Sequence, residues 1–261
     1  MAMEEEILVA KIGGSTLGSH DTTLADVVEL QRRGARPVVV HGGGALISDW
    51  LARHNVPSRF ERGLRVTDAP TLEVAVAVLA GLVNKQLVAS VQALGGRAVG
   101  LSGVDGAMLQ CRLAGEELGF VGEIDAIDPG ALVRVLLAGA IPVIAPIGLL
   151  LEDEKPSAQL VNINADTAAG VIAAALGAKW LAFLTDVEGV RGADGTTLAR
   201  LPADEARRLI ESGVIEGGMI PKVEACLRAA ESGAACLILD GREEHALLSA
   251  VQDGRAGTVV G

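Results

Sequence analysis

The sequence has few of the residues on which metal centres, disulfide frameworks and nucleic-acid-binding surfaces depend. It contains three cysteines, an odd number without C-x-x-C spacing, and four histidines that lack the spacing of metal ligands. We therefore expect buried, reduced thiols and no metal site formed by the protein. Lysine and arginine number 22 against 33 acidic residues, and they are scattered along the chain. Because nucleic acid is bound by clustered cations, this composition argues against nucleic acid as a partner.

The chain also lacks the sequence features of secretion and of a membrane span. Its first residues, Met-Ala-Met-Glu-Glu-Glu, do not have the basic and apolar regions of a signal peptide. The longest uncharged apolar stretch, residues 135–151, contains Pro142 and Pro146. These prolines predict a helix end, a strand and a loop there, rather than a span. We expect a cytoplasmic protein with no membrane partner.

Apolar strands alternate with amphipathic helical segments along the 261 residues, which is typical of an α/β protein with a mainly parallel sheet. Strands are predicted at 7–12, 37–41, 97–101, 141–147, 180–186, 234–240 and 258–260. Helices are predicted at 21–33, 45–54, 70–94, 129–139, 166–176, 204–211, 220–231 and 245–251. A hairpin region is expected over 108–124, and the polar segment 151–160 is expected to be a loop. One sheet with two functional halves, roughly 1–160 and 161–261, fits this pattern better than two independent domains.

Three glycine-rich corners could hold an anion with backbone N–H groups. Lys11-Ile-Gly13-Gly14-Ser15 ends the first strand, His41-Gly-Gly43-Gly44 ends the second, and Gly217-Gly218-Met219-Ile-Pro-Lys222 starts a late helix. Strand ends and helix N-termini of this kind bind phosphate, and a lysine beside them suggests phosphate in transit. The alternatives are tight turns and lysines that are merely solvated.

Several polar residues near these corners also allow two interpretations. Asp166 could cap a helix, or its carboxylate could hold two lysines between reacting anions. Thr185 and Asp186, followed by Gly189, could line a nucleotide pocket at the end of a central strand or simply form a turn. Arg65 could bind a substrate carboxylate in a forked geometry or form a surface ion pair.

The common nucleotide-binding and hydrolytic signatures are missing or incomplete. Ile47 stands where the dinucleotide fingerprint G-x-G-x-x-G requires its third glycine, and no G-x-x-x-x-G-K-[ST] sequence occurs. An NAD-dependent oxidoreductase and a P-loop NTPase are therefore both poor interpretations. No Ser-His-Asp or Cys-His arrangement can be argued from the sequence.

Taken together and in order, nine segments of the chain resemble the amino acid kinase family. They are Lys11-Ile-Gly-Gly-Ser, Val40-His-Gly-Gly-Gly44, Gly63-Leu-Arg-Val-Thr67, Gly81-Leu-Val-Asn-Lys85, Gly100-Leu-Ser-Gly-Val-Asp-Gly106, Leu118-Gly-Phe-Val-Gly-Glu123, Asn162-Ile-Asn-Ala-Asp166, Leu184-Thr-Asp-Val-Glu-Gly189 and Gly217-Gly-Met-Ile-Pro-Lys222. Each motif is weak alone, but the ordered set spans nearly the whole chain and is highly specific.

The resemblance implies a three-layer αβα sandwich around an open, mainly parallel sheet. It implies that the N-terminal half binds an acyl amino acid and the C-terminal half binds ATP with Mg²⁺. The expected reaction, a step of arginine biosynthesis, transfers the ATP γ-phosphoryl group to the side-chain carboxylate of N-acetyl-L-glutamate.

By matching motifs, the resemblance also assigns residues to this reaction. Lys11 and Lys222 would stabilise the transferring group, and Asp166 would organise the two lysines. The substrate-binding residues would be Gly43, Gly44, Arg65 and Asn162, with the last two on the α-carboxylate. The nucleotide-binding residues would be Gly13, Gly14, Ser15, Thr185, Asp186, Gly189, Gly217, Gly218 and Met219.

The sequence departs from the arginine-inhibited branch of this family. Those members carry an extra N-terminal helix and a C-terminal glutamate, whereas here the first strand begins a few residues in and Ala250 occupies the glutamate position. We therefore expect a homodimer that L-arginine does not inhibit, with the helix at 70–94 as a candidate interface. A kinase for carrier-protein-bound aminoadipate or glutamate, and a silent nucleotide-sensing module, remain as alternatives.

Overall fold

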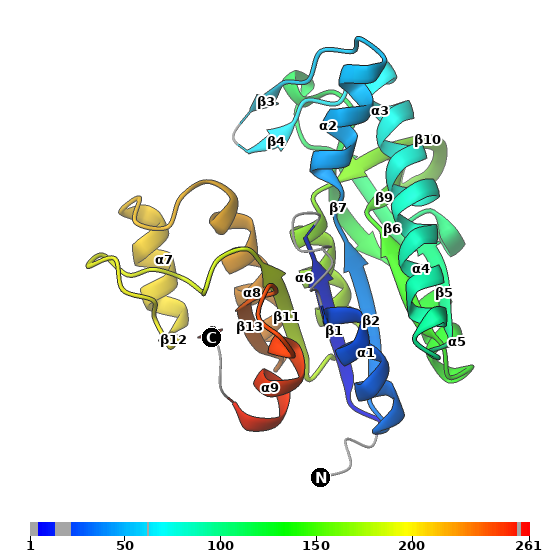
Figure 1. The fold of residues 1–261 in the computed structure, drawn as a ribbon. Coiled ribbons are helices and arrows are strands. Elements are labelled where there is room, and N and C mark those ends of the chain that lie inside the picture. Colours follow the sequence, from blue (N-terminus) through cyan, green and yellow to red (C-terminus); the bar gives the residue numbers. More distant parts are fainter. Residues whose placement is uncertain (1–4, 14–21, 62, 255–256) are drawn as a thin grey trace.

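A computed structural model describes residues 5–13, 22–61, 63–254 and 257–261. Its main sheet has eight strands in the order β12-β14-β13-β11-β1-β2-β8-β5 (Figure 1). They are β1 (Ile7–Ile12), β2 (Arg36–His41), β5 (Ala98–Ser102), β8 (Ile141–Ala145), β11 (Trp180–Thr185), β12 (Arg200–Leu201), β13 (Ala235–Asp240) and β14 (Thr258–Val260). Every pair of neighbours is parallel except β13 and β14. The predicted mainly parallel sheet is confirmed.

Helices cover both faces of the sheet and create two cores. Along β1, Leu8 and Ala10 belong to one core and Val9 to the other, as expected where side chains alternate between faces. The first core is formed with α1 (Thr23–Arg32), α2 (Gly44–Arg53), the helix at 69–93 and α9 (Ala246–Asp253). The second is formed with α5 (Gly130–Leu137), α6 (Ala165–Ala175), α7 (Ala203–Glu211) and α8 (Ile220–Glu231). The fold is therefore the predicted three-layer αβα sandwich.

The helix predicted at 70–94 is present with an irregularity that the sequence did not indicate. It consists of α3 (Ala69–Val76), a π-helical segment η1 (Ala77–Val83) and α4 (Asn84–Ala93). It has 25 residues and contains an 18-residue window with a mean hydropathy of 1.8, so it is long and apolar enough to cross a membrane. Here the helix packs along β5 and β8 as part of one helical layer. Its side chains Ala75, Val78 and Leu87 belong to the first core.

The segment predicted as one strand at 141–147 is divided between two sheets. The strand β8 ends at Ala145, and β9 (Ile147–Glu152) begins a closed four-stranded sheet in the order β10-β7-β6-β9. Its other strands are β6 (Leu109–Leu113), β7 (Val121–Ile127) and β10 (Lys155–Ile163). Pro146 lies at the junction, where its missing N–H costs no ladder hydrogen bond.

The polar segment at 151–160, predicted as a loop, is instead a β-hairpin between β9 and β10. Its turn residues Asp153 and Glu154 have φ angles of 49° and 61°. Positive φ at two successive residues gives the turn whose twist matches that of the flanking strands. The prediction was wrong because charged residues in a tight turn resemble those of an open loop.

The carboxyl ends of the central strands meet the N-termini of three helices at one edge of the sheet. The strands are β1, β2, β11 and β13, and the helices are α2, α6 and α8. Above this edge lies a small hairpin of β3 (Phe60–Glu61) and β4 (Leu64–Arg65) (Figure 1). Short 3-10 turns occur at η2 (Asp105–Ala107), η3 (Glu116–Leu118) and η4 (Gly217–Met219). This edge is where ligands bind in open α/β sheets.

Candidate active site

Three charged side chains from distant parts of the sequence meet at this edge. Lys11 is near the end of β1, and its Nζ lies 2.7 Å from Oδ1 of Asp166 in the first turn of α6. The other oxygen, Oδ2, lies 2.8 Å from Nζ of Lys222 in the first turn of α8. Their side chains are only 10%, 8% and 16% exposed, in the order Lys11, Asp166, Lys222. The cluster has two cations and one anion, so it retains positive charge for an arriving anion.

The electrostatics of the cluster keep Asp166 ionised. Burial acts to raise the pKa of Asp166, but the charges and hydrogen bonds of Lys11 and Lys222 lower it below its usual value. The helix-capping interpretation of Asp166 is wrong, because Asn164 caps α6 instead. The Asn164 Oδ1 atom accepts hydrogen bonds from the backbone N–H groups of Asp166, at 2.8 Å, and Thr167, at 3.0 Å. The Asp166 carboxylate is thereby free to contact both lysines.

A close crossing of α6 and α8 sets the distance between Asp166 and Lys222. A Cβ atom added to Gly170 would lie 2.8 Å from the Cβ and 2.9 Å from the Cα of Ala225. The two helices therefore touch through their backbones, which only a glycine at this position allows. Asp166 and Lys222 lie about one turn before this contact on their respective helices.

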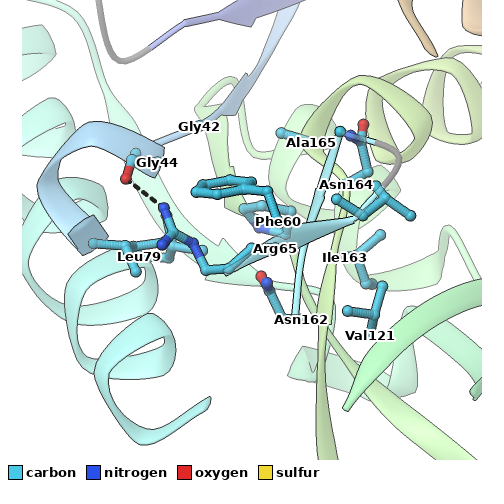
Figure 2. A pocket seen from close by; sticks show the side chains of 15 residues that line it. Gly42, Gly44, Phe60, Arg65, Leu79, Val121, Asn162, Ile163, Asn164 and Ala165 are labelled. Carbon is cyan, nitrogen blue, oxygen red and sulfur yellow. Dashed lines mark hydrogen bonds between the residues drawn. The ribbon is translucent and has the colours of Figure 1, made fainter. Parts of the chain in front are cut away.

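The glycine corner after β2 forms one wall of a cavity of about 160 Å³. The other walls come from the β3–β4 hairpin, the π-helical segment and residues 162–165 (Figure 2). Gly43 is the N-cap of α2, and a Cβ added to it would lie 2.7 Å from Cδ2 of Leu79. Both predicted glycines, Gly43 and Gly44, line this cavity.

Arg65 presents a buried guanidinium to the same cavity. Its Nη2 donates to the Gly44 carbonyl oxygen and to Ser48 Oγ, both at 2.8 Å, and Nη1 donates to Ser58 Oγ. The Phe60 ring lies over it, with 4.6 Å between Cζ and the ring centroid. Arg65 is 7% exposed, and burial lowers its pKa. No carboxylate pairs with Arg65 among the described residues, so the surface ion-pair interpretation does not fit.

Asn162, the other predicted carboxylate-binding residue, lines the cavity near Arg65 (Figure 2). Its Nδ2 donates to Thr67 Oγ1 at 3.3 Å, and its backbone N–H donates to the Phe120 carbonyl oxygen at 2.9 Å. The β10 strand therefore fixes the backbone of Asn162. An amide and a guanidinium on one cavity form a suitable pair of donors for a carboxylate.

The predicted nucleotide residues are spread over the C-terminal half of the edge. Thr185 ends β11, and its Oγ1 donates to Asp186 Oδ1 at 3.2 Å. Gly13 is beside them, since its N–H donates to the Leu184 carbonyl oxygen at 3.3 Å. The η4 turn comprises Gly217, Gly218 and Met219, and leads directly into α8. Gly14 and Ser15 lie outside the described residues.

Gly189 lies somewhat apart from the others and has a packing role. A Cβ added to it would lie 2.5 Å from Thr258 Oγ1. That oxygen accepts from the Val190 N–H at 2.8 Å and donates to the Leu198 carbonyl oxygen. Gly189 thus allows the segment between β11 and β12 to approach β14.

Sequence reasoning missed one pair at this edge. Asp240 ends β13 directly beside Thr185 and accepts a forked pair of hydrogen bonds from Arg242, Nε to Oδ1 at 2.8 Å and Nη2 to Oδ2 at 2.6 Å. The hydrogen bond from Arg242 lowers the pKa of Asp240. The signal was available, because Asp240-Gly-Arg242 follows an apolar strand in the same way as Thr185-Asp186.

The chain matches known proteins along nearly its whole length. Residues 6–240 match the amino acid kinase family. The acetylglutamate kinase of Dehalococcoides mccartyi is 43% identical over 260 residues, covering 99% of this chain and 95% of its own. The acetylglutamate kinase of Thermosynechococcus vestitus is 47% identical over 248 residues, covering 92% and 82%.

A solved structure shows the same arrangement of the chain. The N-acetylglutamate synthase from Neisseria gonorrhoeae, complexed with coenzyme A and N-acetyl-glutamate, superposes with a TM-score of 0.82 at 28% identity. The match covers 99% of this chain and 60% of that one. The similarity therefore concerns one part of the larger synthase chain.

Proposed function

The chain belongs to the amino acid kinase family, and we propose that this site transfers the γ-phosphoryl group of ATP to the side-chain carboxylate of N-acetyl-L-glutamate, as in arginine biosynthesis. The observation that carries the proposal is the pair of lysines sharing Asp166, next to a cavity whose buried Arg65 has no carboxylate partner among the described residues. The cluster suits a phosphoryl group in transit, and Arg65 suits an acidic substrate.

The reaction requires charge neutralisation more than proton transfer. The acceptor carboxylate has an ordinary pKa of about 4.3 and is already ionised at neutral pH, so no general base is needed. One of its oxygens forms a bond to the γ-phosphorus while the bond from that phosphorus to the β–γ bridging oxygen breaks, and ADP leaves. The acceptor carboxylate and the γ-phosphoryl group are both anionic and must approach each other. Lys11 on β1 and Lys222 on α8 offset the repulsion between these two anions.

Each substrate has its own set of donors in this proposal. Arg65 and Asn162 bind the α-carboxylate of N-acetyl-L-glutamate, while the N–H groups of Gly43 and Gly44 face its reacting end. ATP lies between the Lys11 corner and the start of α8, beside Thr185 and Asp186. The described residues contain no group of three metal-ligating side chains. In this proposal Mg²⁺ enters on the ATP phosphates, which is usual for this small, strongly hydrated ion.

We further propose a cytoplasmic homodimer. The strand β5 is an edge of the main sheet, and Val99 on it is 39% exposed. Leu94, the C-cap of α4 and five residues before Val99 in the chain, is 42% exposed. An open edge flanked by apolar side chains favours pairing with a second copy. Light scattering of the purified protein would measure the mass directly.

A hydroxylamine trap tests the reaction and the substrate together. With MgATP, the acyl phosphate is captured as a hydroxamate, and we expect this product with N-acetyl-L-glutamate but not with glutamate, aspartate or aminoadipate. The variants K11A and K222A should each lower kcat by about two to three orders of magnitude, as loss of one oxyanion donor does. Lys179→Ala is the matched control, because this lysine is 53% exposed and pairs with Glu6. Near wild-type turnover in K11A and K222A would refute the assignment.

A further inference from the structure

A buried polar network lies directly behind the glycine corner. His41, the last residue of β2, is 0% exposed, and its Nδ1 lies 2.9 Å from the carbonyl oxygen of Gly42. Its Nε2 lies 3.2 Å from Nδ2 of Asn84, which is also 0% exposed at the start of α4. Burial lowers the pKa of His41 to about 4, the hydrogen bond with Gly42 opposes this, and the charges of Lys11 and Lys85 lower it further. The ring is neutral at pH 7, so only one of its nitrogens carries a proton.

The surroundings of Asn84 determine which nitrogen that is. One N–H of Asn84 Nδ2 donates to the Val143 carbonyl oxygen at 2.8 Å, and the other is shared between the Leu101 carbonyl oxygen and His41 Nε2, each at 3.2 Å. Its Oδ1 accepts from Lys85 Nζ at 3.0 Å, which fixes the orientation of the amide. An amide nitrogen has no acceptor capacity, so Nε2 of His41 must be unprotonated. The proton is therefore on Nδ1, which donates to the Gly42 oxygen.

This donation has a consequence on the other side of the peptide plane. The Gly42 carbonyl and the Gly43 N–H belong to one planar trans peptide and point in opposite directions. His41 binds the Gly42 carbonyl oxygen from the side of the core. The Gly43 N–H is therefore directed toward the cavity that Gly42 and Gly43 line. Within the described part of the chain, no acceptor is paired with this N–H. Between two glycines, a peptide plane rotates easily unless something holds it.

We propose that His41 is a positioning residue, which holds the Gly42–Gly43 peptide so that its N–H donates to the oxyanion at the reacting end of the substrate. This inference rests on the proposed function for the identity of that oxyanion. A donor to the carbonyl also polarises the peptide and strengthens its N–H as a donor. This proposal also assigns a role to the segment Gly81–Lys85, because its Asn84 determines which nitrogen of the His41 ring carries the proton.

Two neighbouring features support a dedicated place for Asn84. A Cβ added to Gly100 on β5 would lie 2.0 Å from Asn84 Oδ1, so glycine is required opposite the amide. The π-helical segment ends at Val83, immediately before Asn84, and such segments frequently occur at functional sites. The helix therefore departs from regular geometry where it delivers this side chain.

Two shape-related variants separate positioning from packing. In His41→Asn the amide nitrogen can take the place of Nδ1 and keep the donor to Gly42. In His41→Gln the longer side chain brings its amide to the place of Nε2, where the oxygen can accept from Asn84, and the donor to Gly42 is lost. Both remove part of a buried ring, so both should lower the melting temperature. We expect H41N to keep kcat within about threefold, and H41Q to lose about 100-fold with an unchanged KM for N-acetyl-L-glutamate. Equal losses in both variants, or full activity in H41Q, would overturn the proposal.

A second measurement needs no activity. In ¹⁵N-histidine NMR spectra of the wild-type protein, His41 should show a protonated Nδ1 and an unprotonated Nε2, without titration between about pH 5.5 and 8. A protonated Nε2, or titration near pH 6.5, would contradict the network even if the variants do not fold. The hydroxamate assay on the wild type tests the function itself, so the two failures can be told apart.

Discussion

Gly170→Ala should impair catalysis by moving a helix rather than by altering a ligand. The added methyl would lie 2.8 Å from Ala225 Cβ, 2.9 Å from its Cα and 3.0 Å from its carbonyl oxygen. Two of these atoms are backbone, so no rotamer change can relieve the clash. Restoring ordinary contact needs a shift of α8 by about 0.5–1 Å, and overpacking of this kind costs about 1–3 kcal/mol of stability.

The displacement should reach Lys222, which is one turn from Ala225 on the same helix. Its Nζ would lose its 2.8 Å contact with Asp166 and its place beside the transferring phosphoryl group. Misplacement by about 1 Å can cost about 100-fold in rate, so we expect kcat to fall between about 10- and 100-fold. The KM for N-acetyl-L-glutamate should not change, because Arg65 and Gly43 lie on other elements.

Two measurements check this chain of effects. Steady-state kinetics give the split between kcat and KM, and competitive acetylation followed by mass spectrometry gives the reactivity of each lysine. Lys222 should become more reactive in G170A while Lys11, held by β1, does not. Gly81→Ala is the matched control, since a Cβ there meets no atom within 4 Å. Wild-type kcat together with unchanged Lys222 labelling would show that the helix crossing does not set the contact.

Three further variants address charge and recognition. Asp166→Asn should destabilise the protein by about 3 kcal/mol at pH 7, because it leaves buried cations unpaired. Folding lowers the pKa of Asp166, so the difference in unfolding free energy between wild type and variant should be complete above about pH 4 and shrink below it. Urea titrations at several pH values would measure this difference. Arg65→Lys should raise the KM for N-acetyl-L-glutamate about 10- to 100-fold, from the loss of forked bonding worth about 1.5–3 kcal/mol; an unchanged KM would move the α-carboxylate elsewhere. Asp26 raises the pKa of His245 through a 2.6 Å hydrogen bond, so this stabilisation is complete below about pH 6.5 and lost as pH rises through the folded pKa. The melting difference between wild type and Asp26→Asn should accordingly be larger at pH 6 than at pH 9, to an extent limited by the exposure of His245.

Local patterns were sufficient to predict most of the edge where the site lies. Lys11 and Thr185 lie at the ends of apolar strands, and Lys222 follows a glycine corner with Pro221 in the helix start, so each is marked by its immediate neighbours. The closed four-stranded sheet was not predictable in this way. At Pro146 the chain could continue as one strand or pass from one sheet to another. The outcome depends on pairing with strands far away in sequence, and the segment would be equally apolar either way.

The positioning residues were hidden for a related reason. Gly170 reads as one more small residue in an alanine-rich helix, and only the approach of α8 gives it a role. His41 was assigned no role because a lone histidine before three glycines has no local signature. Its proposed role depends on Asn84, which contacts it from the start of α4, directly after the π-helical segment. Tertiary contact, rather than local propensity, decides such positions.

The charge of the whole chain and the charge of the site have opposite signs, and Asp166 reconciles them. A net charge of −11 repels ATP and an acidic substrate at long range. Attraction must therefore be local, from two lysines and the N-termini of α2, α6 and α8. Two ammonium groups this buried would repel each other in the free enzyme, and Asp166 between them prevents that while leaving a net positive charge. A single lysine would need no such carboxylate, but it could not contact both the attacking and the leaving oxygen. We therefore regard the shared carboxylate of Asp166 as the group that allows two lysines to bind one phosphoryl group.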